Sequence, residues 1–161
     1  MKDFPPVLKI VTLWLLAGAL VFVGFQTFLS EQQRAQFSLA SGTIEIRRGP
    51  DGHYHWPGAV NGVAVDFLVD TGATTTALPD ELARRAGLQA DGSIVSSTAG
   101  GTVRGRMARA DLTLDGGVRA TQLRVAVLPA LHAPLLGMDV LSRLHWAQQG
   151  NVLRIEPPPA R

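Results

Sequence analysis

Closely spaced glycine turns divide the chain from Thr43 to Glu156 into short runs that are rich in β-branched residues. Asn61-Gly62 is typical of a two-residue type I′ turn, in which both residues take positive φ, and it predicts a hairpin. Asp115-Gly116-Gly117 predicts a second hairpin, and Ala99-Gly100-Gly101 predicts a third with a long, flexible tip. Short strands at this spacing indicate an all-β barrel or sandwich.

Two short helices are expected between these strands. Pro79 puts proline at a first helical turn, and Asp80 and Glu81 put acidic groups at the positive end of the helix dipole. Gly87 would end this helix. A second helix is predicted from Met138 to about His145.

The N-terminal region contains a run of twenty residues without a charge, at 10–29. At about 1.5 Å per residue such a helix would cross a bilayer core of roughly 30 Å, so the run predicts a transmembrane anchor. Lys2 and Lys9 favour a cytoplasmic location for residues 1–9. A cleaved signal peptide is the alternative, with Ser38-Leu39-Ala40 as its small-residue site, but the apolar run is long for one and the site lies far downstream.

The rest of the chain divides into three parts. Residues 30–42 are small and polar without strand periodicity and predict a stalk, residues 43–156 form the domain, and residues 157–161 are a proline-rich tail.

Composition restricts the classes of function that remain possible. The net charge is +2 and the arginines are scattered, so no nucleic acid is expected as a partner. The absence of cysteine excludes disulfides and thiolate chemistry. His53 and His55 could share a metal ion, but no third ligand has recognisable spacing, so neither metal nor cofactor is expected.

The apolar run Val63–Val69 ends abruptly in Asp70-Thr71-Gly72, which is followed by Ala73 and three threonines. We expect this strand to be buried on both faces. The carboxylate that follows it would then also lie in a buried region, which is costly without hydrogen-bond donors or a raised pKa. The glycine backbone and the threonine hydroxyls could supply such donors. The alternative is that Asp70 only begins an Asx turn.

The stretch Phe67–Leu78 closely resembles the catalytic motif of retropepsin-like aspartic proteases, especially bacterial membrane-anchored members with an Asp-Thr-Gly-Ala core. Leu135–Leu141 resembles the second motif of that family. The resemblance covers Thr43 to about Glu156 and implies a single-lobe acid-protease barrel. Viral members usually carry arginine where Met138 stands, so a contact made by that arginine is absent here.

The resemblance also implies a role for each site residue. Asp70 would be catalytic, Thr71 would hold the loops of two subunits together, and Gly72 would offer its backbone to the carboxylates. Asp139 would support the loop rather than perform chemistry, and a flap tip would close on the substrate. The predicted site comprises catalytic Asp70, the active-site loop Thr71, Gly72, Ala73 and Thr74, the second motif Gly137 and Asp139, and the flap Gly100 and Gly101.

Peptide hydrolysis by carboxylates needs two of them sharing one proton. Asp66 lies four strand residues from Asp70, about 13 Å at ~3.3 Å per residue, so the two cannot pair. A twofold axis would supply a second copy of Asp70. We therefore expect an obligate homodimer that cleaves polypeptides.

The sequence as a whole predicts an aspartic endopeptidase that is anchored by one helix in a bacterial inner membrane, with its catalytic domain in the periplasm. Two other functions stay open. One is a non-proteolytic module of the same fold that binds peptides or oligomerises a membrane partner. The other is an unrelated exported binding domain in which Asp70 only caps a turn.

Overall fold

The computed structural model describes residues 14–22, 24, 36–38, 42–98 and 101–156, and the chain divides into two units, Met1–Arg34 and Ala35–Arg161. In the first unit, residues 14–22 and 24 are helical. No helix among the described residues is long and apolar enough to span a bilayer. The predicted anchor at 10–29 lies only partly within the described residues, and residues 1–9 lie outside them. The anchor therefore stays a prediction.

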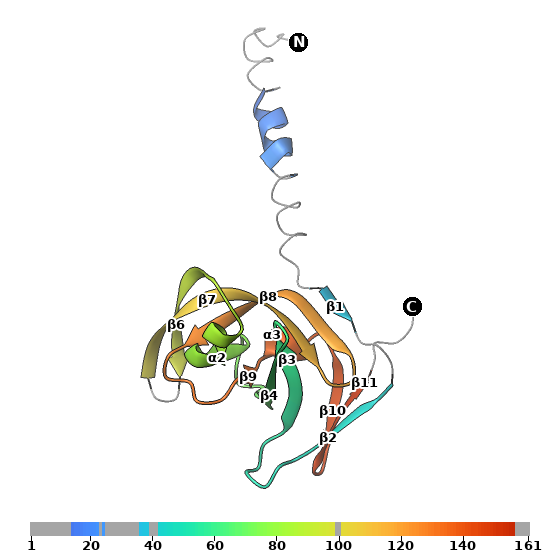
Figure 1. The fold of residues 1–161 in the computed structure, drawn as a ribbon. Coiled ribbons are helices and arrows are strands. Elements are labelled where there is room, and N and C mark those ends of the chain that lie inside the picture. The colour runs from blue at the N-terminus through green and yellow to red at the C-terminus, as the bar shows by residue number, and fades with distance from the viewer. Residues whose placement is uncertain (1–13, 23, 25–35, 39–41, 99–100, 157–161) are drawn as a thin grey trace. The chain divides into compact units, whose positions relative to one another are not determined.

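The second unit is built from two β-sheets (Figure 1). The larger sheet has eight strands in the order β1-β8-β5-β9-β4-β3-β7-β6, and β7 also pairs with β8, which closes the strands from β8 to β7 into a barrel. The smaller sheet has three strands in the order β10-β11-β2. The strands are β1 (Gln36–Ser38), β2 (Ile44–Arg47), β3 (His55–Val60), β4 (Val63–Val69), β5 (Ala77–Pro79), β6 (Ala90–Thr98), β7 (Gly101–Leu114), β8 (Val118–Leu128), β9 (Leu135–Leu136), β10 (His145–Gln149) and β11 (Val152–Glu156).

The predicted hairpins are present in this barrel. Asn61 and Gly62 join β3 to β4 with φ values of 47° and 81°, as a type I′ turn requires. Residues 115–117 join β7 to β8. β6 and β7 pair from Ala90 opposite Ala108 to Thr98 opposite Gly101. The tip of this hairpin, residues 99–100, lies outside the described residues, so its predicted flexibility is untested.

Both predicted helices are present, but the second is shorter than expected. α2 (Asp80–Arg85) follows Pro79, and Gly87 with φ 66° lies just beyond its C-terminal residue. α3 (Met138–Leu141) is a single turn, whereas we expected it to reach His145. The reason is that His145 already belongs to β10 and pairs with Glu156 of β11, so strand pairing ends the helix. The expectation of an all-β fold with two short helices is confirmed.

Two other expectations differ from the structure. The predicted stalk at 30–42 contains β1, which pairs with β8, so strand structure begins before Thr43. β4 is not buried on both faces, because Ala64 and Asp66 are exposed whereas Phe67 is fully buried. Inward and outward positions alternate along the strand. The alternation was hidden because an alanine occupies an outward position.

The core draws its largest side chains from several strands of both sheets. Trp56 of β3 is 1% exposed and its indole N–H donates to the carbonyl of Asp115 at 2.9 Å. Phe67 lies directly opposite Trp56 in the β3–β4 pair and is completely buried. Other fully buried large residues are Leu78, Leu112, Leu136, Leu141 and Ile155. The strand that leads to Asp70 is thus anchored through Phe67.

We expect Phe67→Ala to lower the free energy of unfolding by about 3–5 kcal/mol, because it removes a fully buried aromatic ring and leaves a cavity. Urea denaturation of the two proteins measures this difference. Asp66→Asn, at the exposed neighbouring position, is the matched control and should change stability by less than about 1 kcal/mol. A loss in Phe67→Ala no larger than in the control would contradict the assigned burial.

Candidate active site

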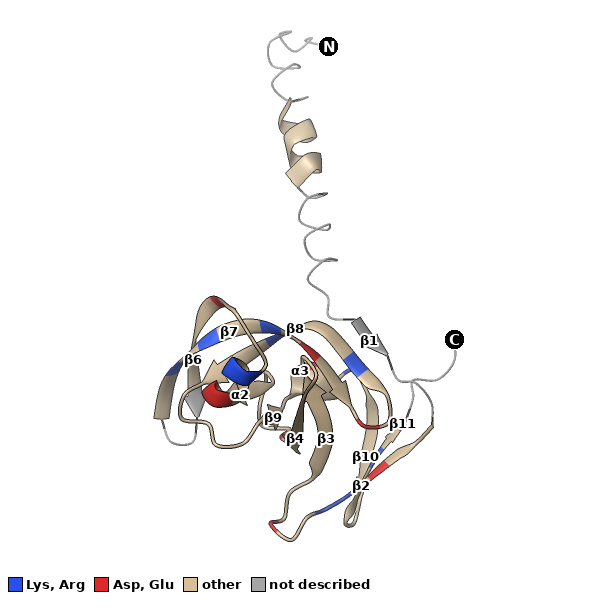
Figure 2. Cartoon of the chain, viewed as in Figure 1, with Lys and Arg blue, Asp and Glu red and all other residues tan. Residues whose placement is uncertain are grey.

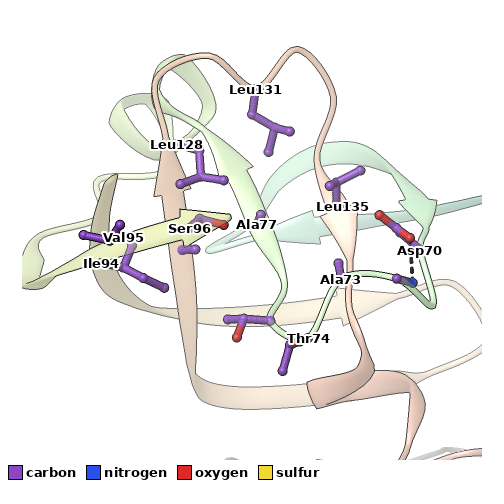
Figure 3. Close-up of a pocket in the computed structure, with 13 residues that line it drawn as sticks. Asp70, Ala73, Thr74, Ala77, Ile94, Val95, Ser96, Leu128, Leu131 and Leu135 are labelled. Atoms are coloured by element: carbon purple, nitrogen blue, oxygen red, sulfur yellow. Dashed lines mark hydrogen bonds between the residues drawn. The ribbon is translucent and has the colours of Figure 1, made fainter. Parts of the chain in front are cut away.

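Asp70 directly follows β4, and its side chain is held by its own turn (Figure 3). The Gly72 N–H donates to Asp70 Oδ1 at 2.8 Å, and the Ala73 N–H donates to the Asp70 carbonyl at 3.2 Å. The Asp70 N–H donates to the Leu136 carbonyl of β9 at 3.0 Å. The Asx turn that was weighed as an alternative is therefore present, and its effect is to orient the carboxylate. An Asx turn and a reactive acid are compatible at this position.

The carboxylate lies at the edge of a groove of about 670 Å³. Asp70 is half-buried and Thr71 and Gly72 are exposed, so a single chain does not bury the acid as the sequence led us to expect. Figure 3 shows Asp70 beside Leu135, with residues 94–96 of β6 on the opposite side of the pocket. The groove is lined by Asp70, Gly72, Ala73, Thr74, Thr75, Ala77, Ile94, Val95, Ser96, Ala126, Leu128, Leu131 and Leu135. Asp70 is its one ionisable lining residue within the described chain, and most of the others are apolar.

The second predicted motif packs directly against the Asp70 loop. The Met138 N–H donates to the Ala73 carbonyl at 2.8 Å, and the Asp139 N–H donates to the Thr74 carbonyl at 3.2 Å. A Cβ atom on Gly137 would lie 2.7 Å from the backbone carbon of Thr75 and 2.9 Å from the Ala73 carbonyl oxygen. Glycine is therefore required for the two segments to approach this closely. The structure brings the residues of both motifs together.

Thr76 and Asp139 form a side-chain contact between these segments. The Thr76 hydroxyl donates to Asp139 Oδ1 at 2.8 Å, and the Thr76 N–H lies 3.0 and 2.9 Å from the two carboxylate oxygens. The Gly137 N–H donates to the Thr76 hydroxyl oxygen at 3.2 Å. Asp139 thus contacts the loop and lies outside the groove lining.

Sequence reasoning missed the importance of Thr76, which it treated only as one of three consecutive threonines. Thr76 is completely buried, the single buried polar residue among those the structure describes. Its position immediately before Ala77 and Leu78, both core residues, was the available signal. A buried hydroxyl that immediately precedes a buried strand must find partners in the protein.

Burial raises the pKa of Asp139 above its ordinary value, and the hydrogen bonds from Thr76 and Val140 oppose part of this effect. Desolvation disfavours the charged carboxylate, whereas donated hydrogen bonds favour it. These two opposing effects on the pKa act on a carboxyl group that is partly buried against the loop. Asp139 supports the loop and does not face the groove, because its side chain is not among the groove lining.

Asp66 does not contribute a second carboxylate. Its Oδ2 lies 3.1 Å from Nδ1 of His55, whose Nε2 lies 2.8 Å from Oδ2 of Asp51. Hydrogen bonding to Asp51 is the largest cause that raises the pKa of His55. Among the described residues, no three His, Cys, Asp or Glu side chains are placed to share one metal ion.

The predicted flap is described only in part. Gly100 lies outside the described residues, whereas Gly101 begins β7 with φ 110° and pairs with Thr98. Ile94, Val95 and Ser96 of the same hairpin line the groove. The hairpin therefore contributes one wall of the site.

Comparison with known proteins agrees with this arrangement. Residues 56–143, which contain the Asp70 loop and the 137–139 segment, match the family described as "gag-polyprotein putative aspartyl protease". The chain belongs to this family of aspartyl proteases. The resemblance to retropepsin-like aspartic proteases is thus confirmed.

Solved structures and a curated relative extend this result. A retropepsin-like aspartic protease from Rickettsia conorii matches 75% of this chain and 92% of its own, with 26% identity and a TM-score of 0.57. EIAV protease, complexed with the inhibitor HBY-793, matches 59% of this chain and 90% of its own at 20% identity and a TM-score of 0.50, which shows the fold alone. An uncharacterized protein of Rickettsia prowazekii (strain Madrid E) is 33% identical over 112 residues, 67% of this chain. The chain spans about half the length of that relative, 48%.

We expect Thr76→Val to lower the free energy of unfolding by about 1–3 kcal/mol, because the substitution leaves the buried Gly137 N–H without its acceptor. Chemical denaturation measures the loss. Thr74→Val is the matched control, since Thr74 is exposed. Equal stability of the two variants would contradict the structural role of the buried hydroxyl.

The raised pKa of Asp139 makes stability depend on pH. The folded state holds the proton more tightly than the unfolded state, so the free energy of unfolding falls as pH rises above the ordinary value of 3.8 toward the raised value. Asp139→Asn removes this titration and should flatten the decline. Urea denaturation at intervals from about pH 3.5 to pH 6 compares the two slopes. Parallel curves for both proteins would contradict the assignment.

Proposed function

We propose that this protein is an aspartic endopeptidase, which hydrolyses peptide bonds with a water molecule activated by two Asp70 carboxylates across a homodimer axis. The observation that carries the proposal is the half-buried Asp70 carboxylate, oriented by the Gly72 N–H at the edge of a groove of about 670 Å³. Membership of an aspartyl protease family supports it. A groove of this kind suits an extended polypeptide.

The need for a second chain follows from the chemistry of the groove. The lining contributes a single carboxyl group in each chain, and neither Asp66 nor Asp139 lines it. General acid–base hydrolysis requires one group that accepts a proton and another that donates one. Two equivalent carboxyl groups placed close together share one proton, because both cannot ionise at that separation. A symmetric dimer is the simplest source of the second group.

In the proposed reaction the ionised carboxylate takes a proton from water while the water oxygen bonds to the scissile carbonyl carbon. The protonated carboxyl group gives its proton to the carbonyl oxygen, and a neutral tetrahedral diol results. One carboxyl group then protonates the amide nitrogen and the C–N bond breaks. A diol hydroxyl returns its proton to the other carboxylate, so the shared proton is restored. No covalent enzyme intermediate forms.

We also propose that residues 10–29 anchor the protein in a bacterial inner membrane and that the catalytic domain faces the periplasm. The segment carries no charge along its whole length. Among its described residues, Trp14 and Leu20 are 70% and 76% exposed, so large apolar side chains face outward from this helix. Such surface favours a lipid environment over water. The lysines at positions 2 and 9 favour a cytoplasmic N-terminus.

The test is cleavage of an unstructured protein by the purified full chain in a mild detergent, at several pH values from about pH 4 to pH 7, because hydrolysis by a coupled pair of acids gives a pH-dependent rate. Asp70→Asn should reduce the rate about a hundredfold or more, because the shared proton is lost. The fold should persist, since the asparagine oxygen can still accept the Gly72 hydrogen bond. Asp66→Asn, on the strand that leads to Asp70 but outside the groove, is the matched control.

Sedimentation under the same conditions reports the oligomeric state. Cleavage that rises with the dimer fraction would support the proposal. A folded dimer that binds peptides without cleaving them would favour the non-proteolytic module. Cleavage that survives Asp70→Asn, or activity in a strict monomer, would contradict the shared pair of carboxyl groups.

A further inference from the structure

The β6–β7 hairpin leaves the barrel at one well-defined residue. β7 pairs with β8 from Arg106 opposite Val127 to Leu114 opposite Val118. Before Arg106, the first residues of β7 pair with β6 alone, and Gly105 lies opposite Ile94. Beyond this point the two strands of the hairpin pair only with each other, whereas Ile94 still packs against a small core cluster of the barrel. Its angle is therefore decided where β7 passes the end of β8.

Gly105 occupies this crossing point because no side chain fits there. A Cβ atom at this position would lie 2.5 Å from the Val127 carbonyl oxygen and 2.6 Å from Leu128 Cδ2, nearer than Cβ atoms approach in real structures. Gly105 does not have positive φ, so the requirement is for space rather than for a special backbone conformation. The hairpin lies this close to β8 only because this residue is glycine.

The next residue makes a polar contact that holds the same point. The Arg106 guanidinium forms an ion pair and hydrogen bond with Oδ1 of Asp80, the first residue of α2. Figure 2 shows acidic and basic positions together on α2. Arg84 of α2 lies 3.7 Å from the same carboxylate. The base of the hairpin is thus tied to α2 on one side, while Gly105 contacts β8 on the other.

The wall that this hairpin contributes to the groove is close to the crossing point. Ile94, which lies opposite Gly105, and its neighbours Val95 and Ser96 line the groove across from Asp70 (Figure 3). Val95 is 65% exposed, the one large apolar side chain with such exposure among described residues of the second unit. A small rotation of the hairpin at Gly105 would move these three residues together and change the width of the groove.

We infer that Gly105 is a positioning residue, and that its contact with β8 together with the Arg106–Asp80 ion pair sets the width of the groove and hence the binding of an extended polypeptide. The inference rests on the proposed function for its kinetic consequence. Gly105 acts through residues 94–96, because it does not itself line the groove. Its substitution should therefore weaken substrate binding more than it slows the chemical step.

The chain offers a matched pair of glycines for the test. A Cβ on Gly92, on β6 of the same hairpin, would meet its nearest neighbours at 3.7 and 3.8 Å, which is ordinary contact. Gly105→Ala should raise KM about tenfold, a loss of ~1.4 kcal/mol in binding, with kcat changed by no more than about twofold, because relieving the overpacked contact displaces residues 94–96. Gly92→Ala should leave both constants near those of the wild type.

A distance measurement tests the geometry without any substrate. The chain has no cysteine, so Thr102→Cys and Thr113→Cys place spin labels at two exposed positions of β7, on either side of Gly105. Dilution with unlabelled protein removes distances between subunits. Gly105→Ala in the full chain should shift the distance distribution, because the bend at the crossing point must change. Gly92→Ala should leave the distribution unchanged.

Each outcome decides the inference. A shifted distance with raised KM in Gly105→Ala alone supports it, whereas an unshifted distance, or equal effects of both substitutions, overturns it. If Gly105→Ala does not fold, Asp80→Asn tests the inference in its place, since this variant removes the ion pair with Arg106 without adding an atom to the core. It should shift the distance in the full chain and change KM by up to about fivefold, and an unchanged distance would overturn the inference. If the wild type cleaves nothing, the proposed function fails, but the spin-label distance still tests the role of Gly105.

Discussion

The contact between the Asp70 loop and the 137–139 segment supports the rest of the site. Thr76 donates both its hydroxyl and its backbone N–H to Asp139, and Gly137 lets the two backbones approach so closely that a methyl group would not fit between them. Because Thr76 is completely buried and Asp139 is partly buried, each satisfies polar groups of the other. Asp70 begins the loop that this contact anchors. The position of the acid therefore depends on residues that take no part in the chemistry we propose.

The groove combines a barrel wall with a separate hairpin wall. The barrel wall consists of the loop and strand residues around Asp70, which are connected through β4, β5 and β9 to the closed barrel. The other wall is the β6–β7 hairpin, whose strands beyond Gly105 pair only with each other. A groove between two such walls suits a long, extended ligand. The half-exposed Asp70 is consistent with a site completed by a second copy of the chain.

Much of the fold and part of the site could be predicted from local patterns. The type I′ turn at Asn61-Gly62 needs positive φ at both residues, and that requirement is strong enough to survive in the tertiary structure. The end of α3 was predicted wrongly because the pairing of His145 with Glu156 ends the helix, and a partner so far along the chain leaves no local trace. β1 was missed for the same reason, since only its pairing with β8 makes residues 36–38 a strand. The burial of β4 was overestimated because alanine fits both inward and outward positions.

The sequence by itself determined the all-β class, the hairpin turns, the family of the chain and the position of the acid at the end of an apolar strand. These features depend on residue type and short-range spacing, which turn geometry and alternation translate directly into structure. Only the tertiary structure decided that Thr76 is the buried partner of Asp139, that Gly137 is a close-contact residue, and that Gly105 lies where β7 crosses β8. Each of these depends on atoms from segments distant in sequence, and close packing between such segments leaves no periodic signal in the chain.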